Sequence, residues 1–354
     1  MAPPSQRALI LPAKRGNFVV GLAVIPRPGP SEVLVRIESA ALNPVEWKIQ
    51  TYGEVGSEVT TLVKGDRMQV FWQGFFEPQH GTYQQYSVVP AELAAKIPST
   101  VPFDEVSALP VAICMAVLGM YNHNPASKSA HFIPPWEKDG PTVNARKPAL
   151  IMGGASSVGQ ACALVSIHPN TVVPPSLSCM IAIQMAKLSG FSPIVTTASP
   201  HKSSLLTTLG ADHVLDRNIA QPELLSQIAT AMAGVPLTFA YDAISSPETQ
   251  RIAFNALAPG GTLIITRKKA ISTLEEQANE SKTIVEVFAS VYVSDNREIG
   301  VALFKQLPGW LESGVLQPNK AEVIPDGLAG ITTGLCRAYQ DWWSQRDQVG
   351  RSSS

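Results

Sequence analysis

Short apolar segments alternate with helical segments from Lys147 onward, and this alternation restricts the possible fold more than any other feature of the chain. Strands are expected at residues 149–152, 193–197, 213–215, 239–243 and 261–265. Helices are expected at residues 182–188, 203–209, 247–257 and 299–313. Repeated strand–helix units of this length predict an α/β fold with a parallel sheet covered by helices.

The first part of the chain has a different pattern. Phe18–Val24 and Val33–Ile37 are short apolar or alternating runs separated by prolines, which predicts β-strands. Phe103–Tyr121 becomes helical in pattern and begins with Asp104 and Glu105, where a helix dipole favours negative charge. The chain of 354 residues is long enough for two such domains.

A glycine-rich turn, Gly153–Gly159, follows the first strand of the alternating region. Its glycines stand where a backbone must turn tightly and approach a pyrophosphate, which the N–H groups of the next helix then bind. The spacing differs from GxGxxG, so a turn of small residues without a ligand is one alternative. A hydrolase nucleophile elbow is another, but Gly154–Val158 lacks the final glycine of GxSxG.

The end of the next strand favours one cofactor. A site for NAD carries an acidic residue about 20 positions after the glycine turn, where it holds the ribose hydroxyls. Here the strand ends in Ser199, Pro200, His201 and Lys202, which offer hydrogen-bond donors and no acid. This set suits the 2′-phosphate of NADPH, and the alternative is a solvated loop with a surface lysine.

The spacing between these two segments is unusually long. Ser199 lies 40 positions after Gly159, about double the expected distance. The excess falls at residues 161–181, which contain Pro169, Pro174 and Pro175 and therefore cannot continue a helix. We interpret residues 161–181 as an insertion, for which an in-frame retained intron is one possible source, and expect the helix at 182–188 to follow it.

Composition argues against several other classes of protein. The net charge of −1 gives no overall field that attracts nucleic acid or an acidic membrane. No leader pattern and no apolar run near the roughly 18 residues of a membrane helix are seen, so we expect a cytoplasmic protein. Cys114, Cys162, Cys179 and Cys336 form no CxxC pair, and His80 is the only histidine before Asp104, so we expect no zinc site.

Several motifs occur in the order that is typical of one enzyme superfamily. They are Asn43–Lys48, Lys64–Arg67, Gly81–Tyr86, Leu109–Val111, Gly153–Gln160 and Gly210–Val214. From about Arg7 to about Leu335 the chain resembles the zinc-independent medium-chain dehydrogenase/reductase superfamily, and more narrowly the fungal trans-acting enoyl reductases that serve polyketide synthases, as in lovastatin biosynthesis. The resemblance implies a GroES-like β-rich substrate domain and a Rossmann-type domain with a doubly wound parallel sheet.

The resemblance also implies domain boundaries and site residues. The substrate domain would span 1–112, the Rossmann domain 113–292 with the insertion 161–181, and the return to the substrate domain with an atypical tail 293–354. The residues implied to bind the cofactor are Val45, Glu46, Trp47, Lys48, Ser156, Ser157, Val158, Gly159, Ser199, Pro200, His201, Lys202, Arg217, Thr262 and Leu263. The residues implied to bind the acyl substrate are Ile113, Cys114, Met115, Ala116, Val117, Leu118, Gly119, Met120, Phe288, Ala289, Ser290, Val291 and Tyr292.

The implied reaction is hydride delivery from NADPH to the β-carbon of an α,β-unsaturated thioester, with negative charge developing on the carbonyl oxygen. Lys48 is the catalytic candidate near that oxygen, and its alternative roles are a surface lysine or a phosphate contact. Tyr121 and Tyr292 are possible donors, with core packing as their alternative. The implied partner is a polyketide synthase of secondary metabolism, and we expect the protein itself to be a monomer.

Two departures from the family keep other functions open. Relatives carry an additional strand–turn–strand between the positions of Gly53 and Val55, and a Lys/Val-rich last strand where this chain has residues 336–343. Loss of strands exposes the edges of a small barrel. The alternatives are therefore a stand-alone quinone or enone reductase and a non-catalytic protein that binds a nucleotide or docks on a partner.

Overall fold

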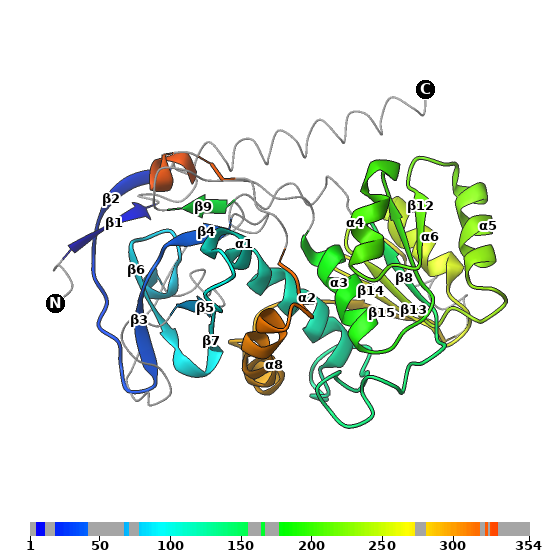
Figure 1. The fold of residues 1–354 in the computed structure, drawn as a ribbon, viewed down its shortest axis with the longest axis horizontal. Helices are drawn as coiled ribbons and strands as arrows, with labels where there is room; N and C mark the ends of the chain where they lie inside the picture. Colours follow the sequence, from blue (N-terminus) through cyan, green and yellow to red (C-terminus); the bar gives the residue numbers. More distant parts are fainter. Residues whose placement is uncertain are drawn as a thin grey trace. The chain divides into compact units, whose positions relative to one another are not determined.

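A computed structural model of the chain describes residues 5–10, 18–41, 67–70, 78–154, 164–166, 177–272, 281–318, 323–324 and 326–331 (Figure 1). The chain divides into two compact units. Unit 1 comprises Met1–Val111, Gln160–Pro175 and Val301–Ser354, and unit 2 comprises Ala112–Gly159 and Ser176–Gly300. This division separates the units after Val111 and before Val301, and the predicted domain boundaries at residues 112 and 292 stay predictions.

Unit 2 contains a six-stranded parallel sheet whose spatial order is β12-β11-β8-β13-β14-β15. The strands are β8 (Ala149–Met152), β11 (Ile194–Ala198), β12 (His213–Asp216), β13 (Phe239–Asp242), β14 (Thr262–Ile265) and β15 (Thr283–Glu286). Numbered along the chain, this order is 3-2-1-4-5-6, the Rossmann order, so the predicted fold class is confirmed. The order reverses between β8 and β13, and such sheets bind ligands beyond the carboxyl ends of the strands at this switch point.

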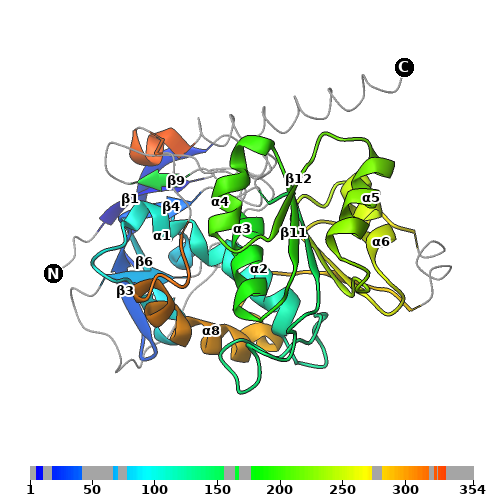
Figure 2. The same cartoon turned by 45° about the vertical axis from the view of Figure 1, so that its right-hand side comes forward.

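Helices cover both faces of the sheet, with α3 and α4 on one face and α5 and α6 on the other (Figure 2). The helices of unit 2 and those that lead into and out of it are α2 (Leu109–Tyr121), α3 (Leu177–Leu188), α4 (Ser203–Thr208), α5 (Gln221–Ala231), α6 (Pro247–Ala256) and α8 (Ser294–Glu312). The observed bounds of α4 and α6 lie within one residue of the predicted ones, whereas α3 and α8 each begin five residues before their predicted starts. Helix α5 and strand β15 were not predicted from the sequence.

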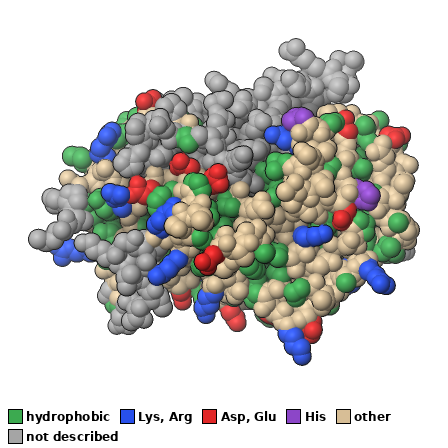
Figure 3. All heavy atoms as spheres, in the orientation of Figure 1, with side chains coloured by type: hydrophobic (Ala, Val, Ile, Leu, Met, Phe, Trp, Pro, Cys, Tyr) green, Lys and Arg blue, Asp and Glu red, His purple; other side chains and the backbone are tan. Residues whose placement is uncertain are grey.

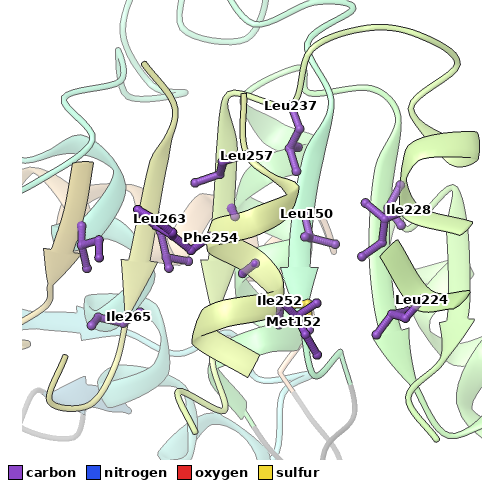
Figure 4. Packing of buried hydrophobic residues seen from close by; sticks show 14 of the residues in the cluster. Leu150, Met152, Leu224, Ile228, Leu237, Ile252, Phe254, Leu257, Leu263 and Ile265 are labelled. Atoms are coloured by element: carbon purple, nitrogen blue, oxygen red, sulfur yellow. The ribbon is translucent and has the colours of Figure 1, made fainter. Parts of the chain in front are cut away.

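Apolar side chains from the sheet, α5 and α6 form one buried cluster (Figure 4). Leu150 of β8 and Leu263 of β14 are fully buried in this cluster. Leu224 of α5 and Phe254 of α6 are also buried, with only 3% and 2% of their surface exposed. Burial of side chains of this size contributes about 1.5–3 kcal/mol each. This packing fixes the strands, and the turns at their carboxyl ends are therefore held on a rigid base.

Unit 1 is rich in β-structure, as the sequence predicts. Its described residues form four two-stranded antiparallel sheets, which are β1-β2, β3-β6, β4-β9 and β5-β7. Their strands are β1 (Ser5–Ile10), β2 (Val19–Val24), β3 (Glu32–Arg36), β4 (Ser39–Ala41), β5 (Met68–Val70), β6 (Tyr86–Pro90), β7 (Ala94–Lys96) and β9 (Leu164–Ser166), and α1 (Phe103–Ser107) follows β7. A short helical turn at Gly327–Ala329 packs with β1 and β2.

The segment predicted as an insertion has two described parts. β9 (Leu164–Ser166) pairs antiparallel with β4, so this part belongs to unit 1. Residues 177–181 belong to α3, which corrects the expected helix start at Ala182. The reason is that Cys179, Met180 and Ile181 are buried and extend the apolar face of the helix. The remainder of 161–181, the region around Gly53 and residues 336–343 lie outside the described residues.

The helical stretch Phe103–Tyr121 differs from the expectation that no run has membrane length. It is 19 residues long with a mean hydropathy of 1.6, so length and composition alone would allow it to cross a membrane. However, 67% of this stretch is buried inside the protein, as in the core helix of a globular fold.

The face in Figure 3 shows Lys and Arg side chains interspersed with Asp and Glu, which agrees with the near-zero net charge.

Candidate cofactor site

The glycine turn after β8 is held by two threonines of β11. Gly153 has a φ of 81°, in the left-handed region that favours glycine, and its N–H donates to Thr197 Oγ1 at 2.9 Å. A Cβ on Gly154 would clash with Thr196 Oγ1, which itself donates to the Ile151 carbonyl at 2.7 Å. Both positions therefore require glycine. The predicted pyrophosphate residues Ser156, Ser157, Val158 and Gly159 lie outside the described residues.

The loop after β11 carries the predicted 2′-phosphate residues. Ser199 is extended, and Pro200–Lys202 forms a short 3-10 turn in which the Lys202 N–H donates to the Ser199 carbonyl at 2.9 Å. His201 is exposed and Lys202 is partly exposed. The backbone of this loop is thus closed on itself, and its basic side chains face outward from the turn.

Arg217 is brought to the same edge of the sheet. Its N–H donates to the Ala198 carbonyl at 3.1 Å, which joins the ends of β11 and β12, and its side chain is exposed. Asp216 is an acidic residue at this edge, since it pairs with Ala198 in the strand register. Its Oδ1 accepts hydrogen bonds from the backbone N–H and side-chain amide of Asn218. The structure therefore brings Ser199, His201, Lys202 and Arg217 together at one edge.

Asp242 at the end of β13 is a polar residue that the sequence analysis did not single out. It is fully buried and pairs in register with Met152, next to Gly153 at the switch point. One carboxylate oxygen accepts from the N–H groups of Ile244 and Ser245, and the other accepts from Thr249 Oγ1 at 2.7 Å. Burial raises the pKa of Asp242 to about 6, although these hydrogen bonds and the charge of Arg267 lower it in part.

A sequence signal for this position does exist. Ser246 caps α6 by accepting from the Thr249 N–H, and Pro247 occupies the first helical turn. An acidic residue at the end of a strand, followed within a few residues by a helix cap, predicts a tight turn. The backbone N–H groups of such a turn need a hydrogen-bond acceptor. Asp242 supplies that acceptor from inside the sheet.

The predicted nicotinamide-side residues Thr262 and Leu263 lie at the opposite edge of the sheet. β14 begins at Thr262, whose N–H donates to the Thr238 carbonyl, and Leu263 is fully buried in the core. Because all six strands are parallel, the carboxyl edge is reached only after Ile265. The residue of this segment at the same edge as Gly153 is Thr266, so the assignment of Thr262 and Leu263 is corrected.

The predicted substrate segments are connected by two buried asparagines. Asn122, which follows α2, donates to Asn296 Oδ1 at 2.7 Å. Asn296 in turn donates to the carbonyls of Phe288 and Ser290. Phe288 is 62% exposed, whereas Ala289, Ser290 and Tyr292 are partly buried and Val291 is fully buried.

The side chains of α2 are mostly buried. Of the residues Ile113 to Met120, only Met115 is partly exposed, and Gly119 leaves no room for a Cβ against Ile264 and Val287. Burial raises the pKa of the Tyr121 hydroxyl, which is hydrogen-bonded to Ser189 Oγ at 2.6 Å and to the Met185 carbonyl. Tyr121 is therefore a packing residue, and a contact between the other residues and a substrate stays a prediction.

The segment Val45, Glu46, Trp47 and Lys48 lies outside the described residues, so the cofactor and catalytic roles assigned to it stay predictions. Tyr292 lies beneath the guanidinium group of Arg297, whose Cζ is 5.6 Å from the ring centroid. This arrangement is an aromatic–cation contact within the protein. It gives Tyr292 a packing partner and leaves its predicted role as a donor unsupported.

Comparisons with known proteins agree with this architecture. The zinc-binding dehydrogenase family matches residues 179–295. The trans-enoyl reductase tndF of Aspergillus flavipes is 29% identical over 256 residues, which cover 64% of this chain and 63% of that protein. The trans-enoyl reductase caaB of Aspergillus niger is 25% identical over 367 residues, covering 94% and 93%. The CurK enoyl reductase structure has a TM-score of 0.67 at 18% identity, covering 96% of this chain and 97% of that one.

The name of the matched family raises the question of a metal. A catalytic zinc ion needs three protein ligands, usually Cys, His, Asp or Glu. Among the described residues, no group of three or more such side chains could hold a metal ion. Within this part of the chain the side chains do not fit zinc, and no chemical step is derived from it.

Several independent observations agree. They are the Rossmann strand order, the glycine turn at the switch point, the order of the sequence motifs, and the similarity to a fungal protein along 94% of the chain. Together these observations show that the chain is similar to proteins of the medium-chain dehydrogenase/reductase superfamily, and in particular to the trans-acting enoyl reductases.

Proposed function

We propose that the chain is an NADPH-dependent enoyl reductase that acts in trans on an acyl thioester carried by a polyketide synthase. The observation that carries the proposal is the carboxyl edge of the sheet in unit 2. There a glycine turn at the switch point adjoins β11, which is followed by Ser199, His201 and Lys202, with Arg217 beside them. The names of the relatives tndF and caaB support the reductase activity.

The residues at this edge fit a nicotinamide dinucleotide. Gly153 and the turn after it would receive the pyrophosphate, because a glycine turn allows close approach of backbone N–H groups. Lys202 and Arg217 would pair with the 2′-phosphate, since cationic donors to phosphate form strong charge-assisted hydrogen bonds. Thr266, at the carboxyl end of β14, takes the place first assigned to Thr262 and Leu263.

When bound, NADPH supplies the hydride that reduces the double bond of the substrate. The protein would hold the thioester and stabilise the negative charge that develops on its carbonyl oxygen. Lys48 remains the residue proposed for that role because its ammonium group is the strongest donor in the segment assigned to the reacting centre. The exposed Phe288 supplies apolar surface for an acyl chain.

An assay with three substrates tests the proposal. Purified protein would be given NADPH with an enoyl thioester of a short pantetheine analogue, with the same acyl group on a carrier domain, or with a free quinone. Oxidation of NADPH by the enoyl thioesters, faster with the carrier-bound form, is the expected result. Turnover of the quinone alone would indicate a stand-alone quinone reductase. NADPH binding without turnover of any substrate would indicate a non-catalytic protein.

A further inference from the structure

A set of buried polar side chains joins the two loops that follow β13 and β14. Asp242, Ser245 and Gln250 are each at least 96% buried, and we call these three residues the edge brace. Buried polar groups are costly unless they are hydrogen-bonded, so their arrangement reports a structural requirement. The loops that they join are residues 243–246 and 266–270, at the carboxyl edge of the sheet.

Ser245 makes the first connection. Its hydroxyl donates to the Asp242 carbonyl at 2.6 Å and accepts the N–H of Thr266 at 2.8 Å. Thr266 Oγ1 completes the contact by donating to the Ala243 carbonyl at 3.3 Å. A single serine hydroxyl therefore connects the end of one strand to the end of its neighbour.

Gln250, on the first turns of α6, makes the second connection. Its side-chain amide donates to the carbonyls of Ser245 and Lys268, both at 3.1 Å. Its Oε1 accepts the N–H of Ala270 at 2.8 Å. Both donors and the acceptor of this fully buried side chain are therefore used between the two loops.

The backbone of Ser245 is strained, and glycine would relieve that strain. Its φ of 51° lies in the left-handed region, which is uncommon for residues other than glycine, and such strain clusters at functional sites. A serine in this position keeps the hydroxyl bridge to Thr266 in spite of the unfavourable backbone. The serine at position 245 therefore maintains the connection between the loops at the cost of an unfavourable backbone conformation.

We infer that Ser245 and Gln250 are positioning residues that hold the loops after β13 and β14 in the shape that receives the nicotinamide cofactor. This inference rests on the proposed function, because both loops lie at the carboxyl edge where the cofactor is assigned. Ala243, Ile244 and Thr266 are partly exposed residues next to the strand ends in the two joined loops. The brace acts through these residues and does not itself contact the cofactor.

The substitution Ser245→Gly tests the inference. It removes the hydroxyl bridge and also relieves the left-handed strain, so the thermal midpoint is expected to change little. We expect the Kd for NADPH to rise at least about tenfold. Hydrogen exchange is expected to accelerate in peptides that contain Ile244, Ser245 and Thr266, and to stay unchanged in α5. Gln250→Met, which removes the second connection, is expected to raise the same Kd and to accelerate exchange of the Ala270 N–H.

Leu224→Ala is the matched control, because it removes a buried side chain of the same unit without touching either loop. It is expected to lower the thermal midpoint and to leave the Kd for NADPH within about twofold of the wild-type value. An unchanged Kd in both Ser245→Gly and Gln250→Met would overturn the role of the brace. Failure of the folded wild-type protein to bind NADPH would overturn the proposed function itself, and with it the assigned role.

Discussion

The carboxyl edge and the amino edge of the sheet in unit 2 are stabilised by different kinds of side-chain contacts. At the carboxyl edge, buried polar side chains (Asp242, Ser245 and Gln250) hold the loops that follow β13 and β14. At the amino edge, Phe239 and Phe191 pack with Phe132, with ring centroids 5.0 to 5.3 Å apart. Backbone hydrogen bonds, such as that from the Thr262 N–H to the Thr238 carbonyl, join strands to loops there, and the Asp212 carboxylate accepts the Ile194 N–H at 2.7 Å.

This difference separates stability from function within one sheet. An apolar, aromatic cluster stabilises the fold by burial, whereas buried polar side chains that hydrogen-bond two loops fix the shape of the backbone. In α/β sheets of this kind the ligand binds at the carboxyl edge. We therefore expect substitutions at the amino edge to change stability and substitutions at the carboxyl edge to change cofactor binding.

The largest expected effect is that of Phe239→Ala at the amino edge. Loss of a fully buried phenylalanine from the aromatic cluster should lower the free energy of unfolding by about 3–5 kcal/mol. Urea unfolding followed by circular dichroism measures this loss, and Phe288→Ala is the control, because Phe288 is 62% exposed and should change stability by less than about 0.5 kcal/mol. A weaker affinity of the folded Phe239→Ala protein for NADPH would contradict the claim that substitutions at the amino edge change stability and not cofactor binding.

The next effect concerns the pH dependence of stability at the carboxyl edge. The pKa of Asp242 is raised by burial to about 6 in the folded protein, above its ordinary value of 3.8. Folding therefore favours the protonated form. The contribution of this group is complete below about pH 4 and is lost as the pH rises through about 6, by up to about 3 kcal/mol.

Urea unfolding of the wild type and of Asp242→Asn at several pH values measures this contribution. The stability of Asp242→Asn relative to the wild type should increase as the pH rises from about 4 to about 7. Asp139→Asn, in an exposed loop, is the matched control and should show no such trend. A difference between Asp242→Asn and the wild type that does not vary with pH would contradict the assignment.

The smallest change in stability is expected for Gly154→Ala. Its Cβ would meet Thr196 Oγ1 and Leu206 Cδ1, so the turn must shift at a cost of about 1–3 kcal/mol. Because the turn is the proposed pyrophosphate site, the Kd for NADPH should rise more than about tenfold. Gly309→Ala on the exposed side of α8, where a Cβ meets nothing within 4 Å, is the control and should leave binding unchanged. Normal NADPH binding by Gly154→Ala would place the pyrophosphate elsewhere.

The elements of the sheet were predictable where sequence pattern and burial coincide. The strands at 149–152 and 239–243 are compact apolar runs that end at glycine or acid, and all their residues in β8 and β13 are buried. By contrast, α5 was not predicted, although Leu224 and Ile228 are buried and Leu225 and Ala231 pack against the same cluster at helical spacing. β15 has two buried residues between exposed ones, which is a weak signal in the sequence.

The site was predictable only in part. The loop at Ser199–Lys202 follows directly from the chain order, since it ends the strand after the glycine turn. Thr262 and Leu263 were placed at the wrong edge because a resemblance identifies a strand without fixing which of its ends faces the ligand. The edge brace could not be predicted, because the connection between Ser245, Gln250 and Thr266 depends on how two neighbouring strands and a helix lie together.

The most direct test of the account is a parallel titration of the purified protein with NADPH and NADH, followed by nicotinamide fluorescence, for the wild type and Lys202→Ala. We expect NADPH to bind the wild type at least about tenfold more tightly than NADH. We also expect Lys202→Ala to weaken the binding of NADPH and to leave that of NADH unchanged. Equal affinity for the two nucleotides, or no binding of either by a folded sample, would contradict the claim that the carboxyl edge is an NADPH site.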